Sequence, residues 1–490
     1  MLGTELPADE LLRRPLWQAR DLGLPIPAST HAVSVALPRW QDVVGYEEKR
    51  PEVINRLSMG YPRFVVHPLV QELGRHLGQG SPCLPFPSAA AAELAAGFVR
   101  RTADLPAKVI SRGEAFGVAT NTDGLIALRA FWQHTGLIVS SRQAEALLHG
   151  RGADNNADQA RASLRRQLAE LYECAENDIF LAPTGMASMF AALRAVGQRT
   201  ARAPTIQLGF PYVDTLKLQQ KLGHGGILLH HLGSIEPELR ALLDQQRIAG
   251  CFCEIPGNPL LGCADLRIVS PLLRERRVPL IVDDVVATPL NVNLAPYADL
   301  VATSLTKFIV GTGDAMGGAL VCNPRSPLYS ELKPIIQAQH QELLWREDAA
   351  VLAQHAPSFP DRMRRHNETG RLIAERLRQH KAIERVWYPK WEFAEAYEAV
   401  RRPDGGWGAL ITFLPKEAEQ NSPRIYDRLP FCKGPSLGTV FTLACPFTLL
   451  AHYTELDWAE SCGVSRYLIR ISVGLEDPEE LSQRLDRALV

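Results

Sequence analysis

The sequence Val278-Pro279-Leu280-Ile281-Val282-Asp283 is a short apolar run that ends in a carboxylate. A second run, Leu300-Val301-Ala302-Thr303-Ser304-Leu305-Thr306-Lys307, ends in an amine. Short apolar runs that follow turn-rich sequence are typical of buried strands in a parallel sheet. Because ligands gather at the carboxyl ends of such strands, we expect Asp283 and Lys307 to face one pocket.

Pyridoxal phosphate requires such a pair: Lys307 would hold it as a Schiff base, and Asp283 would bond the pyridinium nitrogen. The two residues could instead form a surface ion pair or two solvated strand ends. Three neighbouring features favour the cofactor site. Ser304 and Thr306 place hydroxyl groups beside the lysine, a glycine-rich loop follows at 311–318, and lysine is scarce, with ten among 53 basic residues.

A candidate phosphate turn lies upstream. The apolar run 179–183 is followed by Thr184-Gly185-Met186 and then by apolar residues at helical spacing. A strand, a Thr-Gly turn and a helix aim backbone amides and a helix N-terminus at a phosphate. The same pattern is also an ordinary helix N-cap. The order along the chain, with phosphate turn, aspartate and then lysine, supports the cofactor interpretation.

These motifs together resemble those of the Cys/Met-metabolism enzymes that use pyridoxal phosphate, from about residue 156 onward. The resemblance implies that Thr184, Gly185, Met186, Ser304 and Thr306 bind the cofactor with Lys307 and Asp283. It implies that Tyr212, in Pro211-Tyr212-Val213-Asp214-Thr215, stacks on the cofactor ring and assists the leaving group. Asn258 would contact both cofactor and substrate, and Ser436 and Arg470 would bind the substrate. The planar fork of Arg470 suits a carboxylate.

The N-terminal part most resembles the fungal type of cystathionine γ-synthase, through residues 31–38, 45–48 and 60–64, as does 433–438. In relatives, a Tyr-x-Arg segment from one subunit completes the phosphate site of its neighbour. Tyr61 and Arg63 match that spacing, which implies a homodimer or homotetramer with shared active sites. Arg142 is an alternative donor, and Arg63 could also be a solvated loop residue.

The chain departs from the family pattern in two informative places. Arg63 and Thr184 are 121 positions apart, where relatives use about thirty, so residues 81–155 are interpreted as an insertion. Pro435 stands where many relatives have a glutamate before the Ser-Leu-Gly motif, which leaves the reaction outcome open. The predicted organisation is an arm at 1–80 that contributes to the neighbouring active site, the insertion, a cofactor-binding α/β domain at 156–355 and a C-terminal α+β domain at 356–490.

Alternating helical and strand patterns predict the fold. We expect helices at 216–222, 237–245 and 266–277 and strands at 227–232, 249–255 and 278–283, which is typical of a doubly wound, mostly parallel α/β sheet. The fold class is therefore that of fold-type I pyridoxal-phosphate-dependent transferases. The C-terminal part favours a helix at 362–380, strands at 383–387, 410–414, 439–443 and 468–473, and a last helix capped by Asp477.

Composition narrows the function classes. With 490 residues and a net charge of −1 spread along the chain, neither a nucleic acid nor a membrane surface is an indicated partner. No apolar run is long enough to cross a membrane, and no signal pattern opens the chain. Nine cysteines without a Cys-x-x-Cys pair favour the reducing cytoplasm and give no metal site, and Cys251 and Cys253 are interpreted as neighbours on one strand face.

The predicted activity is γ-replacement on an activated homoserine, an O-acyl or O-phospho ester, with cysteine as nucleophile to give cystathionine. Lys307, Tyr212 and Asp283 are the predicted catalytic residues. A γ- or β-lyase acting on sulfur amino acids, or a γ-synthase that uses sulfide or a carbon acid, remains an alternative. A catalytically dead oligomeric scaffold is the non-enzyme alternative, although a scaffold needs neither Lys307 nor Asp283.

Overall fold

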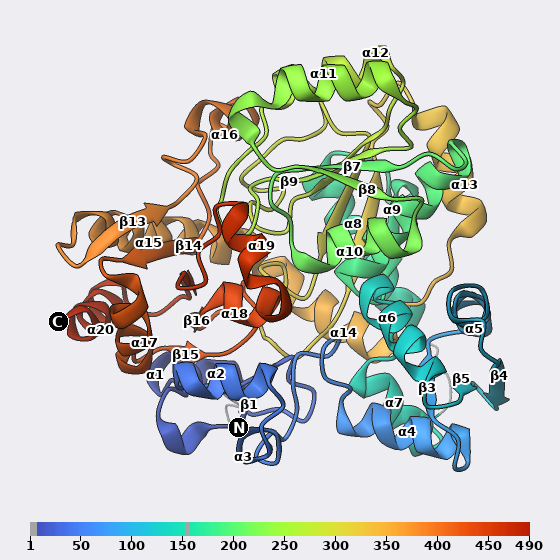
Figure 1. Ribbon diagram of the computed structural model, residues 1–490, viewed down its shortest axis with the longest axis horizontal. Helices are drawn as coiled ribbons and strands as arrows, with labels where there is room; N and C mark the ends of the chain where they lie inside the picture. Colours follow the sequence, from blue (N-terminus) through green and yellow to red (C-terminus); the bar gives the residue numbers. More distant parts are fainter. Residues whose placement is uncertain (1–6, 152–156) are drawn as a thin grey trace.

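A seven-stranded sheet forms the centre of the chain (Figure 1). The computed structural model describes residues 7–151 and 157–490. The strands lie in the order β6 (Ile179–Ala182), β12 (Gly318–Cys322), β11 (Leu300–Ser304), β10 (Leu280–Asp283), β9 (Cys251–Glu254), β7 (Thr205–Leu208) and β8 (Gly226–Leu229). Only β12 runs antiparallel to its neighbours. The predicted doubly wound, mostly parallel fold is confirmed.

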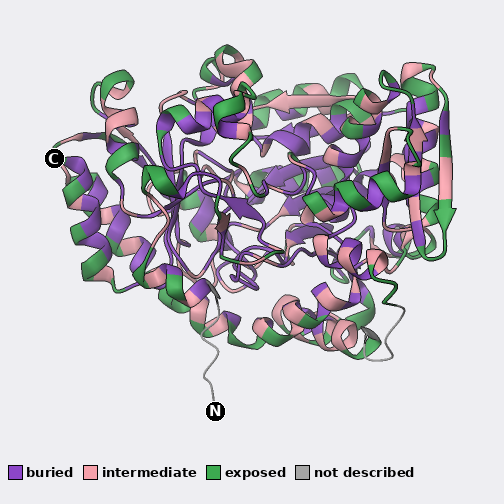
Figure 2. Cartoon of the chain, turned by 90° about the horizontal axis from the view of Figure 1, so that it is seen from below, coloured by how far each residue is buried: buried purple, intermediate pink, exposed green. Residues whose placement is uncertain are grey.

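Both faces of this sheet are covered. Successive residues of a strand enter different cores, since Cys251 and Cys253 join one hydrophobic cluster and Phe252 joins the other. Figure 2 shows the buried strands between helices with exposed outer faces. The covering helices are α8 (Ala157–Tyr172), α9 (Gly185–Arg199), α10 (Val213–Leu222), α11 (Ile235–Gln245), α12 (Leu266–Glu275), α13 (Tyr329–Gln339) and α14 (Arg346–His355).

The C-terminal part forms a five-stranded sheet, in the order β13 (Ile383–Trp387), β14 (Leu410–Pro415), β17 (Ile469–Ser472), β16 (Leu443–Cys445) and β15 (Cys432–Lys433). Its helices are α15 (Phe359–Gln379), α16 (Ala394–Val400), α17 (Ala418–Arg428), α18 (Phe447–His452), α19 (Leu456–Ser461) and α20 (Pro478–Leu489). Asp477 caps α20 by accepting the amides of Glu479 and Glu480. The strand predicted at 439–443 begins only at Leu443, as β16, because Gly438 turns the chain at φ +73° and the Val440 amide donates to the carbonyl of Gly311 instead.

The N-terminal arm packs on the C-terminal sheet of its own chain, which Figure 1 shows as blue elements beside red ones. It contains α1 (Pro7–Arg13), β1 (Pro25–Ile26), β2 (Ser34–Val35), α2 (Trp40–Glu47) and α3 (Pro51–Ile54). The amide of Leu37 donates to the carbonyl of Lys433, and the Tyr426 hydroxyl donates to the carbonyl of Leu37, both at 2.8 Å. These hydrogen bonds fix the arm on the C-terminal domain.

Residues 68–148 form a small subdomain beside the large sheet. It consists of α4 (Pro68–Gly78), β3 (Cys83–Phe86), α5 (Ala89–Ala103), β4 (Ala107–Arg112), β5 (Ala115–Thr120), α6 (Gly124–Thr135) and α7 (Ser141–Leu148). Its sheet is antiparallel, in the order β3-β5-β4. Phe131 packs edge-on against Phe190 of α9, with ring centroids 6.0 Å apart. Since α4 packs on β3, the predicted boundary at 81 divides this unit.

Within the described ranges, none of the helices combines the length and apolar character that a membrane crossing needs.

Candidate active site

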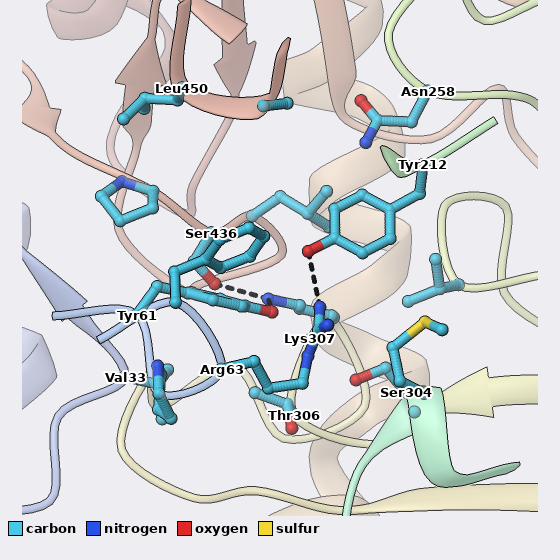
Figure 3. Close-up of a pocket in the computed structure, with 18 of the residues that line it drawn as sticks. Val33, Tyr61, Arg63, Tyr212, Asn258, Ser304, Thr306, Lys307, Ser436 and Leu450 are labelled. Carbon is cyan, nitrogen blue, oxygen red and sulfur yellow. Dashed lines mark hydrogen bonds between the residues drawn. The ribbon is translucent and has the colours of Figure 1, made fainter. Parts of the chain in front are cut away.

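A cavity of about 150 Å³ lies where β10, β11, the start of α9 and the C-terminal domain meet (Figure 3). All the residues predicted to contact cofactor or substrate line it: Tyr61, Arg63, Thr184, Gly185, Met186, Tyr212, Asn258, Asp283, Ser304, Thr306, Lys307, Ser436 and Arg470. The fold thus brings together side chains that are spread over more than 400 positions of sequence.

Lys307 lies at the centre of this pocket. Strand β11 ends at Ser304, so the lysine stands on the turn that follows, not on the strand itself. Its Nζ donates to the Ser436 Oγ at 2.6 Å and to the Tyr61 Oη at 3.2 Å (Figure 3). Burial lowers the pKa of Lys307, which favours the neutral, nucleophilic amine. The amine is therefore both held in place and made easier to deprotonate.

Tyr61 is in direct contact with Lys307, which the sequence did not indicate. Burial alone would raise the pKa of Tyr61, but the charges of Lys307 and Arg63 lower it to about 8. A phenol with this pKa exchanges a proton near physiological pH. The sequence predicted Tyr61 only as a cofactor ligand, because nothing local connects it to a lysine 246 residues away.

Asp283 and Glu254 end neighbouring strands and are paired in register. Burial raises the pKa of Asp283 to about 6, and burial together with Asp283 raises the pKa of Glu254 to about 8. Glu254 accepts the backbone amides of Tyr212 at 2.6 Å and of Asn258 at 3.1 Å, so it fixes both segments. A cation beside Asp283, such as a pyridinium N–H, would offset its burial. The donor set therefore fits the cofactor.

The start of α9 fits a phosphate. The backbone amides of Gly185 and Met186, in the first turn of α9, donate to no acceptor among the described residues. A Cβ added at Gly185 would lie 2.7 Å from the Ser304 Cβ, so only glycine allows the helix to approach β11 this closely. The Thr184 hydroxyl instead donates to the Gly136 carbonyl and caps the helix by accepting the Ala187 amide. Backbone amides, rather than the threonine hydroxyl, are the free donors here.

Arg63 lines the pocket of its own chain. Its guanidinium donates to the Tyr212 hydroxyl and pairs with the buried carboxylate of Asp214, which also contacts His134 Nδ1 at 2.9 Å. Burial opposes ionisation of Asp214, but Arg63 and His134 outweigh it and lower the pKa. The structure differs here from the expected exchange of Tyr61 and Arg63 between subunits. The arm packs on its own C-terminal domain and so delivers both residues within one chain.

Arg470, in the centre of β17, is held for carboxylate binding. Its guanidinium donates to Asn258 Oδ1 at 3.0 Å and to the Ser436 carbonyl at 2.6 Å. It also lies over the Phe447 ring, 4.9 Å from the centroid. Ser436 adopts φ +99°, a backbone conformation that non-glycine residues rarely adopt. This strain aims its hydroxyl at Lys307 and its carbonyl at Arg470.

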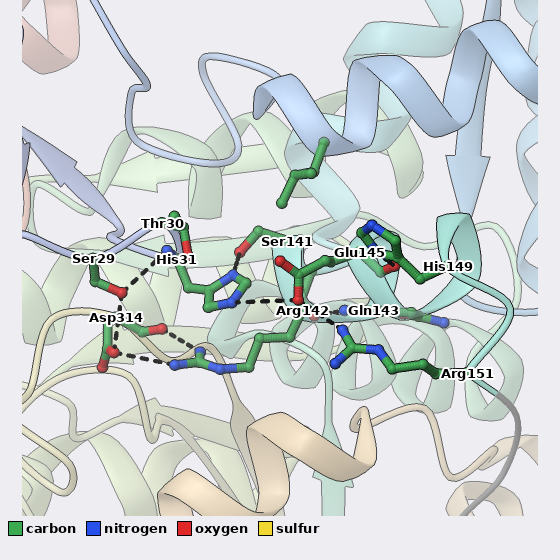
Figure 4. A network of polar contacts seen from close by, with 12 residues as sticks. Ser29, Thr30, His31, Ser141, Arg142, Gln143, Glu145, His149, Arg151 and Asp314 are labelled. Atoms are coloured by element: carbon green, nitrogen blue, oxygen red, sulfur yellow. Dashed lines mark hydrogen bonds and ion pairs between the residues drawn. The ribbon is translucent and has the colours of Figure 1, made fainter.

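Two predicted neighbours are engaged elsewhere. The Thr306 hydroxyl accepts the Gly317 amide at 3.1 Å, which braces the turn that carries Lys307. Arg142 lies outside the pocket of its own chain, and the alternative that it supplies the phosphate-site arginine of a neighbouring subunit stays a prediction. It pairs with Asp314 at 3.1 Å and with Asp348 at 3.2 Å, next to a His31–Ser141 contact of 3.0 Å (Figure 4). Arg142 therefore ties the small subdomain to the loop that follows Lys307.

Comparisons with known proteins agree with this pocket. The family model of Cys/Met metabolism PLP-dependent enzymes matches residues 140–490. The chain is 32% identical to cystathionine gamma-synthase of Neurospora crassa, covering 96% of this chain and 98% of that protein. It is 33% identical to an L-2-amino-4-chloropent-4-enoate dechlorinase/desaturase of Streptantibioticus cattleyicolor, covering 94% and 96%.

A solved cystathionine gamma synthase from Xanthomonas oryzae, in complex with cystathionine, superimposes with a TM-score of 0.60 at 27% identity, over 69% of this chain and 88% of that one. The sequence, the fold and the donor set of the pocket thus agree. The chain belongs to the Cys/Met-metabolism family of pyridoxal-phosphate-dependent enzymes.

Proposed function

We propose that the enzyme replaces the γ-substituent of an O-acyl or O-phospho homoserine with cysteine and so forms cystathionine. The observation that carries the proposal is the placement of Lys307 between the Tyr61 and Ser436 hydroxyls, next to an Arg470 that is already fixed. Pyridoxal phosphate, when bound, supplies an electron sink for the negative charge that develops on the substrate carbon.

Each group in the pocket would bind the part of the cofactor or substrate that has the complementary charge. The amides of Gly185 and Met186 would hold the phosphate, and Asp283 would hold the protonated ring nitrogen. Arg470 would bind the substrate α-carboxylate with the donors not used by Asn258 and Ser436. The strong buried contacts around each group keep these positions fixed before substrate arrives.

Proton transfer is assigned to Lys307 and Tyr61. Lys307 would move protons at the substrate carbons after its amine is displaced, helped by its lowered pKa. Tyr61, with a pKa near 8, would accept the proton of the incoming ammonium group and return it to the departing oxygen. Tyr212, whose hydroxyl accepts a hydrogen bond from Arg63, would stack on the cofactor ring and assist the leaving group.

Elimination without replacement is the second candidate. It is favoured by the similarity to the dechlorinase/desaturase and by Pro435, whose carbonyl accepts the Ser34 hydroxyl and leaves no carboxylate at this position. The proposed assembly is a homodimer or homotetramer. The nine free cysteines support the cytoplasm as its compartment.

The test is incubation of the holoenzyme with O-acetyl-, O-succinyl- and O-phosphohomoserine, each with and without cysteine. We expect thioether to form with at least one ester, and ammonia and keto acid to fall when cysteine is present. Equal release of ammonia and keto acid in both conditions, with no thioether, would contradict γ-replacement and support the lyase.

A further inference from the structure

Glu47 lines the pocket but has no role in the chemistry described above. It is the last residue of α2, and α18 packs against this helix with Phe447, Leu450 and Ala451 on the pocket wall. Among the residues that the structure describes, Glu47 has no hydrogen-bond or ion-pair partner. Lys49, the nearest cation in sequence, bonds the Tyr46 carbonyl at 3.0 Å instead.

The other two carboxylates of the pocket are satisfied. Glu254 accepts two backbone amides, and Asp283 accepts the Val285 amide at 2.9 Å. Glu47 is the unmatched one, and burial raises its pKa to about 7. Its position in the last turn also places a negative charge at the negative end of the helix dipole. The half-buried carboxylate of Glu47 makes no hydrogen bond or ion pair with the described residues, so it is available to a ligand in the pocket.

The ligand must bring a positive charge that no other residue satisfies. In γ-replacement, the α-carboxylate of the first substrate is matched by Arg470 and its amine is used at the cofactor. Its leaving group is neutral or anionic, which a carboxylate does not attract. The incoming thiol amino acid, in contrast, carries an α-ammonium group into the same pocket.

We propose that Glu47 binds the α-ammonium group of the second substrate, and so selects cationic and zwitterionic thiols over anionic ones. The inference rests on the proposed γ-replacement. Glu47 is a specificity-determining residue and takes no part in bond making.

Three thiols distinguish the effect of the ammonium group from that of the carboxylate. Cysteine carries both groups, 2-mercaptoethylamine carries only the ammonium group, and 3-mercaptopropionate carries only the carboxylate. Thioether formation is measured for the wild type and for Glu47→Gln. Glu48→Gln is the matched control, since Glu48 is exposed and bonds Arg50 and Tyr453. We expect Glu47→Gln to lower kcat/KM roughly 10- to 100-fold for the two ammonium thiols, mainly through KM, the loss typical of one charge-assisted hydrogen bond.

The third thiol is the internal control. With 3-mercaptopropionate, Glu47→Gln should match or exceed the wild type, and Glu48→Gln should leave all three thiols unchanged. Glu47→Asp keeps the charge and should retain more cysteine activity than Glu47→Gln, which guards against a folding defect. An equal effect of Glu47→Gln on all three thiols, or none, overturns the role of Glu47 alone. A wild type that makes no thioether with any thiol overturns this role together with γ-replacement.

Discussion

Replacing Tyr61 by phenylalanine removes the hydroxyl that accepts a hydrogen bond from Lys307 at 3.2 Å. Lys307 and Arg63 lower the pKa of Tyr61 from 10.0 to about 8 against the opposing effect of burial. Two pKa units correspond to about 2 to 3 kcal/mol of preferential stabilisation of the phenolate. Since a positioned acid or base contributes about 10²- to 10⁴-fold, we expect Tyr61→Phe to lower kcat by about 10²-fold or more.

The pH dependence gives a second readout of the same change. A phenolate accepts the proton of the substrate ammonium group, so wild-type kcat/KM should rise as pH increases through about 8. This rise should be absent in Tyr61→Phe. Steady-state thioether formation between pH 6 and 10 measures both effects, with the cofactor absorbance as a check of loading.

Tyr46→Phe is the matched control, because Tyr46 lines the same pocket and burial raises its pKa, so its hydroxyl stays protonated and exchanges no proton near pH 8. We expect its kcat to stay within about threefold of the wild type, as for substitutions away from the reacting groups. If Tyr61→Phe behaves like Tyr46→Phe and keeps the rise near pH 8, Tyr61 is not the proton carrier.

Three further predictions concern the frame of the site. Ser436→Gly should raise the free energy of unfolding by about 1 kcal/mol, measured by urea unfolding, because glycine adopts a φ of +99° without strain. The same variant should lose turnover, because it removes the Ser436 hydroxyl that accepts a hydrogen bond from Lys307. Arg142→Ala removes the arginine that pairs with Asp314 and Asp348 and should lower the free energy of unfolding by about 3 to 5 kcal/mol. Arg166→Ala, at an exposed ion pair, should lower it by less than about 1 kcal/mol, and similar losses in both variants would refute the structural role of Arg142. Co-expression of Lys307→Ala and Arg63→Ala chains should give no restored activity, because each pocket takes both residues from one chain; recovery in the mixed oligomers would show exchange between subunits.

The elements that were predicted well from the sequence are those whose pattern of apolar and turn residues is local. Asp283 and Lys307 follow apolar runs that need burial on both faces, and the Thr184-Gly185 turn sits between such a run and a helix. Strand β13 was predicted at its observed bounds, Ile383–Trp387, for the same reason. These patterns depend on neighbours within about ten residues, and a single sequence contains that information.

The features that the sequence missed depend on contacts between distant segments. The strand predicted at 439–443 begins only at Leu443, because the Val440 amide bonds the carbonyl of Gly311, which is distant in sequence. The pKa of Tyr61 reflects Lys307, and Arg142 is directed to Asp314 by the position of the small subdomain. Propensity and spacing do not encode such pairings, because tertiary packing decides them.

Reduction of the holoenzyme with borohydride, followed by peptide mapping, tests the central claim most directly. Reduction fixes the cofactor covalently on the lysine that holds it. The pocket geometry predicts a pyridoxyl group on the peptide that contains Lys307, and its absence from Lys307→Ala protein. A modified lysine elsewhere in the chain, or no modified peptide from protein supplied with pyridoxal phosphate, would contradict the assignment of this pocket as the active site.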